Sequence, residues 1–217
     1  MTIKKFKNKY HNVSTFKKIN TIIKDKLEKE NFKKLKILEF GVDKGISTAL
    51  FLEFCNKRNG KLYSLDTIDY SKHFSDKNWT FINCRDDDYT TVNKIVDFPV
   101  DIIFLDTEHT AKHVEKIFYM YFDKLKINGL FIIDDISWLP YIKNAWRNNE
   151  WIENNNKETF YKLIEIYNSN QKKIKISFQF DHSGLAIIQK KGLGLKKPIS
   201  IKSRRFGVRN ILRTLLY

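Results

Sequence analysis

Short runs of apolar residues recur along the middle of the chain and are separated by segments of mixed polarity. Five such runs occupy residues 35–42, 61–67, 79–85, 100–106 and 129–136. Several contain unbroken apolar stretches, such as Ile102-Ile103-Phe104-Leu105, whereas a strand with one face in water would alternate apolar and polar residues. The pattern therefore predicts five strands that are buried on both faces.

The segments between these runs favour helices. The clearest is 110–125, where apolar residues recur every three or four positions: Val114, Ile117, Phe118, Tyr121, Phe122 and Leu125. Alternation of strand and helix predicts a parallel sheet with right-handed crossovers. Two further runs, 173–180 and 184–191, are joined by only Asp181, His182 and Ser183, which favours an antiparallel hairpin. We expect an α/β, Rossmann-like three-layer sandwich whose mostly parallel seven-stranded sheet ends in that hairpin.

The two ends of the chain differ from this central part. Residues 12–31 have the spacing of an amphipathic helix, and residues 192–217 combine seven basic residues with apolar positions at helical spacing. We expect an N-terminal helical extension over 1–34, a central domain over 35–191 and a basic tail over 192–217. The tail is compatible with an anionic membrane surface, RNA, another subunit of a homo-oligomer, or its own domain.

Composition narrows the class of protein. The 217 residues contain no stretch approaching the roughly 18 to 20 apolar residues of a membrane-spanning helix, and only two cysteines, Cys55 and Cys84. Both features favour a cytoplasmic protein. The net charge of +15 would attract nucleic acid, but lysine greatly outnumbers arginine and accompanies abundant Asn and Ile, as in AT-rich genomes. A nucleic-acid partner is therefore not favoured.

The first apolar run ends in a glycine-containing turn, Glu39-Phe40-Gly41-Val42-Asp43-Lys44-Gly45-Ile46-Ser47. Ligands of open parallel sheets bind at such a strand-to-helix turn. The spacing differs from the G-x-G-x-x-G pattern that binds pyrophosphate, and two carboxylates would repel phosphate but suit a cation. The motif resembles the first motif of class I S-adenosylmethionine-dependent methyltransferases. That resemblance implies that Gly41 and Gly45 lie under the methionine end, with Glu39 facing its ammonium and Ser47 helping at the helix start.

Two later acids continue the expected cofactor site. Asp66 ends the second run at the distance from the glycines where an acid reaches ribose hydroxyls. Asp86 follows the third run, where the resemblance implies contact with the adenine edge. The alternative for Asp86, Asp87 and Asp88 is that they are solvated acids at the start of a helix.

Three carboxylates follow the fourth and fifth runs: Asp106, Asp134 and Asp135. Neighbouring parallel strands bring their carboxyl ends together, so we expect these side chains to converge beside the cofactor. Carboxylates that close repel one another unless they are protonated or bind a metal, and hard oxygen ligands suit Mg²⁺. The sequence predicts a metal site here.

The stretch 104–136 resembles the metal-dependent O-methyltransferases, including the catechol and macrolide-sugar branches. It has an Asp-x-x-His motif, a helix and an Asp-Asp pair, although Asn128-Gly129 replaces the usual paired glycines. The resemblance spans about residues 35–191. It implies S-adenosyl-L-methionine and Mg²⁺ as cofactors, and transfer of a methyl group to a hydroxyl of a small molecule or sugar.

In such a reaction a base must remove the proton of the acceptor hydroxyl. His109, three residues after Asp106, is the candidate general base. It could instead be a surface or capping histidine, or form a zinc pair with His113. Aromatic residues at 138, 141, 146 and 151 could wall the acceptor pocket, form a lid, or belong to the core. The alternative functions are a nucleic-acid methyltransferase and a noncatalytic binding module on the same fold.

Overall fold

A computed structural model describes residues 21, 34–139, 149–180, 183–201 and 208 of the chain. The predicted N-terminal helix over 12–31 lies outside these residues, apart from Thr21. In chain order the described elements are β1 (Lys36–Phe40), α3 (Ile46–Lys57), β2 (Lys61–Asp66), β3 (Trp79–Asn83), α4 (Tyr89–Ile95), β4 (Val100–Leu105), α5 (Ala111–Tyr121), the 3₁₀ turn η1 (Phe122–Lys124), β5 (Leu125–Asp134), α6 (Glu150–Asn170), β6 (Ile174–Gln179) and β7 (Leu185–Lys190).

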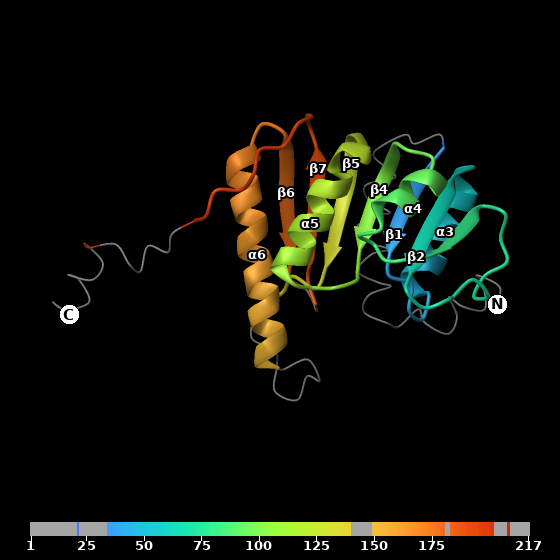
Figure 1. The fold of residues 1–217 in the computed structure, drawn as a ribbon, viewed down its shortest axis with the longest axis horizontal. Coiled ribbons are helices and arrows are strands. Elements are labelled where there is room, and N and C mark those ends of the chain that lie inside the picture. The colour runs from blue at the N-terminus through green and yellow to red at the C-terminus, as the bar shows by residue number, and fades with distance from the viewer. Residues whose placement is uncertain (1–20, 22–33, 140–148, 181–182, 202–207, 209–217) are drawn as a thin grey trace.

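The strands form one seven-stranded sheet in the order β3-β2-β1-β4-β5-β7-β6 (Figure 1). β1 pairs in parallel with both β2 and β4, and the parallel pairing continues to β3 on one side and β5 on the other. β7 is antiparallel to both β5 and β6. The predicted mostly parallel sheet ending in an antiparallel hairpin is confirmed. The order places the ends of β1 and β4 side by side at the point where the strand order reverses, which is where ligands of such sheets bind.

Two apolar clusters, one on each face of the sheet, explain the continuous apolar runs. In β4, Ile103 and Leu105 belong to the cluster that packs with α5, while Ile102 and Phe104 belong to the cluster that packs with α3. Successive residues of a strand point to opposite faces, so a strand covered on both faces has no solvent-facing position. All six residues of β4 are buried.

The helices begin at side-chain caps where the sequence supplies them. The side chains of Asp88, Thr110 and Asn149 accept hydrogen bonds from main-chain N–H groups in the first turns of α4, α5 and α6. α3 differs, because Gly45 precedes it in a left-handed conformation without a side-chain cap. α6 packs beside α5 on one face of the sheet (Figure 1).

The fifth strand begins four residues before the apolar run that predicted it. Its pairing with β4 starts at Leu125 and Val100 and then shifts register between Val100 and Ile102. Asn128 has a φ of 66° within this irregularity. The Asn128-Gly129 pair is therefore a bulge inside the strand and does not mark its beginning.

The described start of the basic tail lies on its own domain. Asn170, at the end of α6, accepts a hydrogen bond from the main-chain N–H of Lys196 (2.7 Å) and donates one to its main-chain oxygen (2.9 Å). The hydroxyl of Tyr119 on α5 donates to the same oxygen (2.6 Å). These contacts hold the tail against α5 and α6 as far as residue 196.

None of the described helices combines the length and the apolar character needed to cross a membrane.

Candidate active site

A pocket of about 270 Å³ lies at the carboxyl ends of β1, β2 and β4. Four residues predicted from the sequence line it: Gly41, Asp66, Asp86 and Asp106. Its other lining residues are Leu65, Thr67, Cys84, Arg85, Thr107, Glu108 and His113. The pocket thus lies where the strand order reverses, and its lining contains four carboxylates but only one arginine.

Gly41 brings the ends of β1 and β4 into close approach. Its φ is +94°, and a Cβ at this position would overlap the main-chain oxygen of Asp106. Its N–H donates to the main-chain oxygen of Leu65 in β2 (3.0 Å). Only glycine combines this conformation with this contact, so the first glycine of the turn is required by the meeting of three strands.

Glu39 lies beneath the turn and has no exposed surface. Its carboxylate accepts hydrogen bonds from the hydroxyls of Ser47 (2.6 Å), Thr48 (2.8 Å) and Ser64 (2.6 Å). Burial raises the pKa of Glu39 to about 7, and the three hydroxyls partly offset that rise. The structure therefore places Glu39 and Ser47 behind the pocket wall, joined to each other, while the pocket lining includes neither of them nor Gly45.

Asp66 joins the end of β2 to the glycine turn. One carboxylate oxygen accepts from the N–H of Val42 (2.9 Å), and the other accepts from the N–H of Ile68 (3.0 Å). Asp66 therefore fixes the turn and borders the pocket at the same time. Asp66 lines the pocket, and its contact with ribose hydroxyls stays a prediction.

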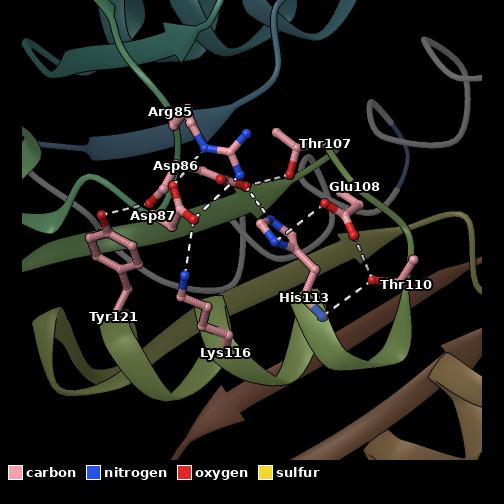
Figure 2. Close-up of polar contacts among 9 residues, drawn as sticks. All are labelled: Arg85, Asp86, Asp87, Thr107, Glu108, Thr110, His113, Lys116 and Tyr121. Atoms are coloured by element: carbon pink, nitrogen blue, oxygen red, sulfur yellow. Dashed lines mark hydrogen bonds and ion pairs between the residues drawn. The ribbon is translucent and has the colours of Figure 1, made fainter.

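Asp86 is almost fully buried in the pocket wall and is held by residues from two later elements (Figure 2). Its Oδ2 accepts from the hydroxyl of Thr107 (2.5 Å) and lies 2.7 Å from Nε2 of His113. The hydroxyl of Tyr121 donates to its main-chain oxygen (2.8 Å). The alternative of three solvated acids at a helix start therefore does not describe Asp86.

Its two neighbours behave differently. Asp87 pairs with Arg85 and Lys116, and the hydrogen bond from Arg85 is the largest cause that holds the pKa of Asp87 far below its ordinary value. Asp88 caps α4. The run of three acids thus supplies one pocket residue, one surface ion pair and one helix cap.

A second group of side chains meets beside this pocket. Nε2 of His109 lies 3.6 Å from Oδ1 of Asp106 and 3.5 Å from Oδ2 of Asp135, so one imidazole faces carboxylates from the ends of β4 and β5. All three side chains are partly exposed. We call Asp106, His109 and Asp135 the acid–base cluster.

The paired acids after β5 have separate roles. Asp134 is buried, and its Oδ1 accepts from the N–H of Asp135 (2.8 Å) and the hydroxyl of Ser183 (3.2 Å). Asp135 has a φ of 56°, an unfavourable conformation for a residue with a Cβ. Asp134 thus stabilises a sharp turn, and that turn carries the carboxylate of Asp135 toward His109.

Asp106 and Asp135 supply hard carboxylate oxygens from two adjacent strands, which is the donor type that Mg²⁺ prefers. Within the described ranges, however, no three His, Cys, Asp or Glu side chains form a group that could hold a metal ion as it stands. His109 and His113 face different carboxylates, so this geometry gives no support to a zinc pair.

Residues of α6 that the sequence did not single out support the acid–base cluster. The hydroxyl of Thr159 donates to the main-chain oxygen of His109 (3.1 Å), and the amide of Asn156 donates to that of Ser137 (2.8 Å). Both side chains are buried. Their three-residue spacing on a helix could have indicated a shared face, but only the fold shows that this face meets both loops.

The aromatic segment after the fifth run is divided between different environments. Trp138 packs against Phe160 of α6 with ring centroids 6.1 Å apart, whereas Trp151 is exposed. The positions 141 and 146 lie outside the described residues. Trp138 therefore belongs to the packing of α6, and Trp151 does not belong to the core.

Comparison with known proteins agrees with this geometry. Residues 38–136 match the family described as "Methyltransferase domain". No curated protein sequence matches the chain. The matched region begins in β1 and ends just after Asp135, so it contains both the pocket and the acid–base cluster.

Solved structures share the fold at low sequence identity. MycE methyltransferase from the mycinamycin biosynthetic pathway, in complex with Mg, SAH and mycinamycin VI, superposes with a TM-score of 0.63 at 18% identity, covering 88% of this chain and 55% of MycE. A Staphylococcus aureus protein provisionally named as a caffeoyl-CoA O-methyltransferase superposes with a TM-score of 0.59 at 19% identity, covering 87% of this chain and 98% of that protein. The SAH-bound Podospora anserina methyltransferase PaMTH1 superposes with a TM-score of 0.57 at 15% identity, covering 72% of each chain.

This chain spans about 55% of the length of MycE, and identities below 20% establish the fold alone. The family match covers the part of the sequence that contains the pocket residues and the acid–base cluster. Residues 38–136 are thus similar to a methyltransferase domain, and the sheet order and the pocket at the strand reversal agree with that match.

Proposed function

We propose that this protein is a Mg²⁺-assisted O-methyltransferase that transfers the methyl group of S-adenosylmethionine to a hydroxyl of a small molecule or sugar. The observation that carries the proposal is the acid–base cluster, in which one imidazole faces carboxylates from two adjacent strand ends beside the cofactor pocket.

The pocket suits the methyl donor. Its lining contains Asp66, Asp86, Asp106 and Glu108 but a single basic residue, Arg85, which pairs with Asp87. Carboxylates favour the positive sulfonium and ammonium groups of S-adenosylmethionine. Gly41, which has no side chain, lines the same pocket.

His109 has the geometry of a general base. Methyl transfer is an in-line displacement, so the acceptor oxygen must lie opposite the leaving sulfur and lose its proton. The ring of His109 is partly exposed, and the adjacent carboxylates of Asp106 and Asp135 would stabilise the imidazolium that forms when it takes this proton. Bound by the same two carboxylates, Mg²⁺ would lower the pKa of the acceptor hydroxyl.

The acidic surroundings of the site argue against a polyanionic acceptor. The net charge of +15 is a property of the whole chain, whereas the site presents carboxylates to its substrate. A phosphate backbone would be repelled at this surface. A neutral hydroxylated acceptor meets no such repulsion.

The test measures transfer of radiolabelled methyl from S-adenosylmethionine to a panel of catechols and sugar-bearing small molecules, with RNA as a parallel acceptor. We expect transfer to a small hydroxylated acceptor that EDTA abolishes and added Mg²⁺ restores. Transfer to RNA that EDTA leaves unchanged would instead establish the nucleic-acid enzyme. Cofactor binding without transfer to any acceptor of the panel would support the noncatalytic module.

A further inference from the structure

A groove of about 630 Å³ lies along the outer side of α5, away from the cofactor pocket. Tyr119 and Met120 line it and also pack against the core, so they form an apolar floor. The other lining residues are charged: Lys112, Glu115 and Lys116 from α5, and Lys197 from the basic tail. The groove thus combines an apolar floor with three lysines.

The tail beside this groove has a fixed main chain and exposed apolar side chains. The N–H of Ile199 donates to the hydroxyl of Ser169 (3.0 Å), and the N–H of Ile201 donates to Oε1 of Glu165 (3.1 Å). α6 therefore holds the tail as far as residue 201. The side chains are not covered, because Ile199 is 73% exposed and Ile201 is 38% exposed.

A chain of ion pairs connects the groove to these isoleucines. Lys162 of α6 pairs with Glu115 in the groove (3.3 Å) and with Glu165 (2.8 Å), and Glu165 accepts the hydrogen bond from Ile201. The groove and the exposed tail are therefore neighbouring parts of one surface. We call the following residues the basic–apolar face: Lys112, Lys116, Met120, Lys197, Ile199 and Ile201.

The charge that this face presents is positive. Its two nearby acids, Glu115 and Glu165, both pair with Lys162. Lys112 and Lys197 are exposed, and within the described part of the chain neither of them forms an ion pair. A partner of this face therefore meets two uncompensated ammonium groups beside exposed aliphatic side chains.

We infer that the basic–apolar face docks on the surface of an anionic lipid bilayer. Lysines attract anionic headgroups, and aliphatic side chains enter the boundary between headgroups and acyl chains. RNA would use the lysines but leave both isoleucines in water. A second copy of the same face would set lysines against lysines.

This inference goes beyond the proposed function and does not depend on it. None of the six residues of the face lines the cofactor pocket or belongs to the acid–base cluster. Methyl transfer to a soluble acceptor should therefore be unchanged when the face is altered.

The test is flotation of the full chain with vesicles of phosphatidylcholine alone or of equal parts phosphatidylcholine and phosphatidylserine. We expect binding only to the second kind, and release at high salt. Lys112→Gln combined with Lys197→Gln should lower the partition coefficient about twentyfold, from about fivefold for each lysine. Ile199→Gln combined with Ile201→Gln should lower it about tenfold.

The matched control is Lys72→Gln combined with Lys77→Gln. It removes the same charge from exposed positions of the loop before β3, the edge strand at the other side of the sheet. Its partition coefficient should change less than about twofold. Equal losses in the two lysine pairs would mean that only net charge attracts the protein, and would overturn the inference.

Absence of binding to the phosphatidylserine vesicles would also overturn it. Two further measurements then identify the other possible partners. Loss of affinity for a single-stranded RNA in Lys112→Gln with Lys197→Gln, measured by fluorescence anisotropy, would assign the face to RNA. A dimer in sedimentation velocity that Ile199→Gln with Ile201→Gln dissociates would assign it to a second copy. Melting temperatures of the three double variants separate loss of folding from loss of binding.

Discussion

The two halves of the site use carboxylates in opposite ways. In the glycine-turn half, Glu39 is completely buried and receives three hydroxyl hydrogen bonds. In the acid–base half, Asp106 and Asp135 keep 33% and 18% of their side chains exposed and face a histidine that is itself 29% exposed. The first carboxyl group has all its partners inside the protein, whereas the second pair remains accessible to a substrate or an ion.

The backbone does not share this contrast. The glycine turn has left-handed conformations at Gly41 and Gly45, where they cost little, but also at Asp43 (φ 43°), and the acid–base half places Asp135 at a φ of 56°. Strain at a non-glycine residue persists where the surroundings enforce it, and it is common at functional sites. The difference between the halves therefore lies in their carboxylates: one half buries its carboxyl group and the other presents charge.

The largest effect on activity is expected from substitutions that remove a carboxylate of the acid–base half. Asp106→Ala and Asp135→Ala should each lower methyl transfer by about a thousandfold or more, because each removes a carboxylate that faces His109. Calorimetric affinity for S-adenosylhomocysteine should change less than about threefold in Asp135→Ala. Asp123→Ala, an exposed carboxylate at the opposite end of β5, serves as the control. Normal turnover in either variant would remove the cluster from the mechanism.

A second experiment concerns the glycine-turn half. The pKa of Glu39 is raised by burial to about 7 in the folded protein, from 4.5. A raised carboxyl pKa means that the folded state binds the proton more tightly, so its contribution is complete below pH 4.5 and is lost as pH rises to 7. Relative to Glu39→Gln, the free energy of unfolding of the wild type should therefore fall by about 3 kcal/mol between these pH values.

Denaturant unfolding followed at several pH values measures this difference. Glu158→Gln, an exposed position of α6, is the control that should show no such dependence. Parallel pH curves for the wild type and Glu39→Gln would mean that Glu39 does not take up a proton in this range. The contrast between a buried carboxyl and an accessible pair would then lose its energetic basis.

The smallest effect tests how α6 supports the acid–base half. Asn156 and Asn170 are both buried on α6, and each donates to a main-chain oxygen of another segment, Ser137 for the first and Lys196 for the second. Asn156→Leu and Asn170→Leu should lose similar stability, about 1–2 kcal/mol each. Only Asn156→Leu should also lower the turnover number, by about tenfold, because only its partner lies next to the acid–base cluster. Equal turnover in the two variants would make Asn156 a purely structural residue.

The sheet was predictable because its cause is local. A strand covered on both faces is mostly apolar, as β4 and the second half of β5 are, and the seven runs found from the sequence coincide with the seven strands although β6 and β3 include exposed or partly exposed polar positions. The beginning of β5 was not predictable in the same way. The Asn128-Gly129 pair has the composition of a turn, and only its pairing with β4 makes it a bulge.

The candidate site was partly predictable. Gly41, Asp66, Asp86 and Asp106 could be found because they follow strands, and strand ends meet at one edge of a parallel sheet. The direction in which Glu39 points could not be read in this way, because its position in the motif is compatible with either side of the turn. Its burial depends on hydroxyls from α3 and β2 that lie 8 to 25 residues away in the chain.

Lys190 is a further residue whose environment could not be predicted from the sequence. Lysine side chains are rarely buried, yet Lys190 is 1% exposed and donates to the main-chain oxygens of Phe122 (2.9 Å) and Leu125 (2.7 Å). Those carbonyls are available because α5 ends beside β7, a neighbourhood that no pattern in the sequence records. Burial of an ammonium is tolerated only where such acceptors are already in place.

The order of apolar runs and helices along this chain determined the α/β sheet, its terminal hairpin and the edge where a ligand can bind, since each depends on the period of apolar residues and on strand direction. The tertiary structure alone decided which acids are buried and which face His109, that His113 lies against Asp86, and that α6 supports the loops of the site. Those facts depend on side-chain contacts between residues far apart in the chain, and such contacts exist only after the core has packed.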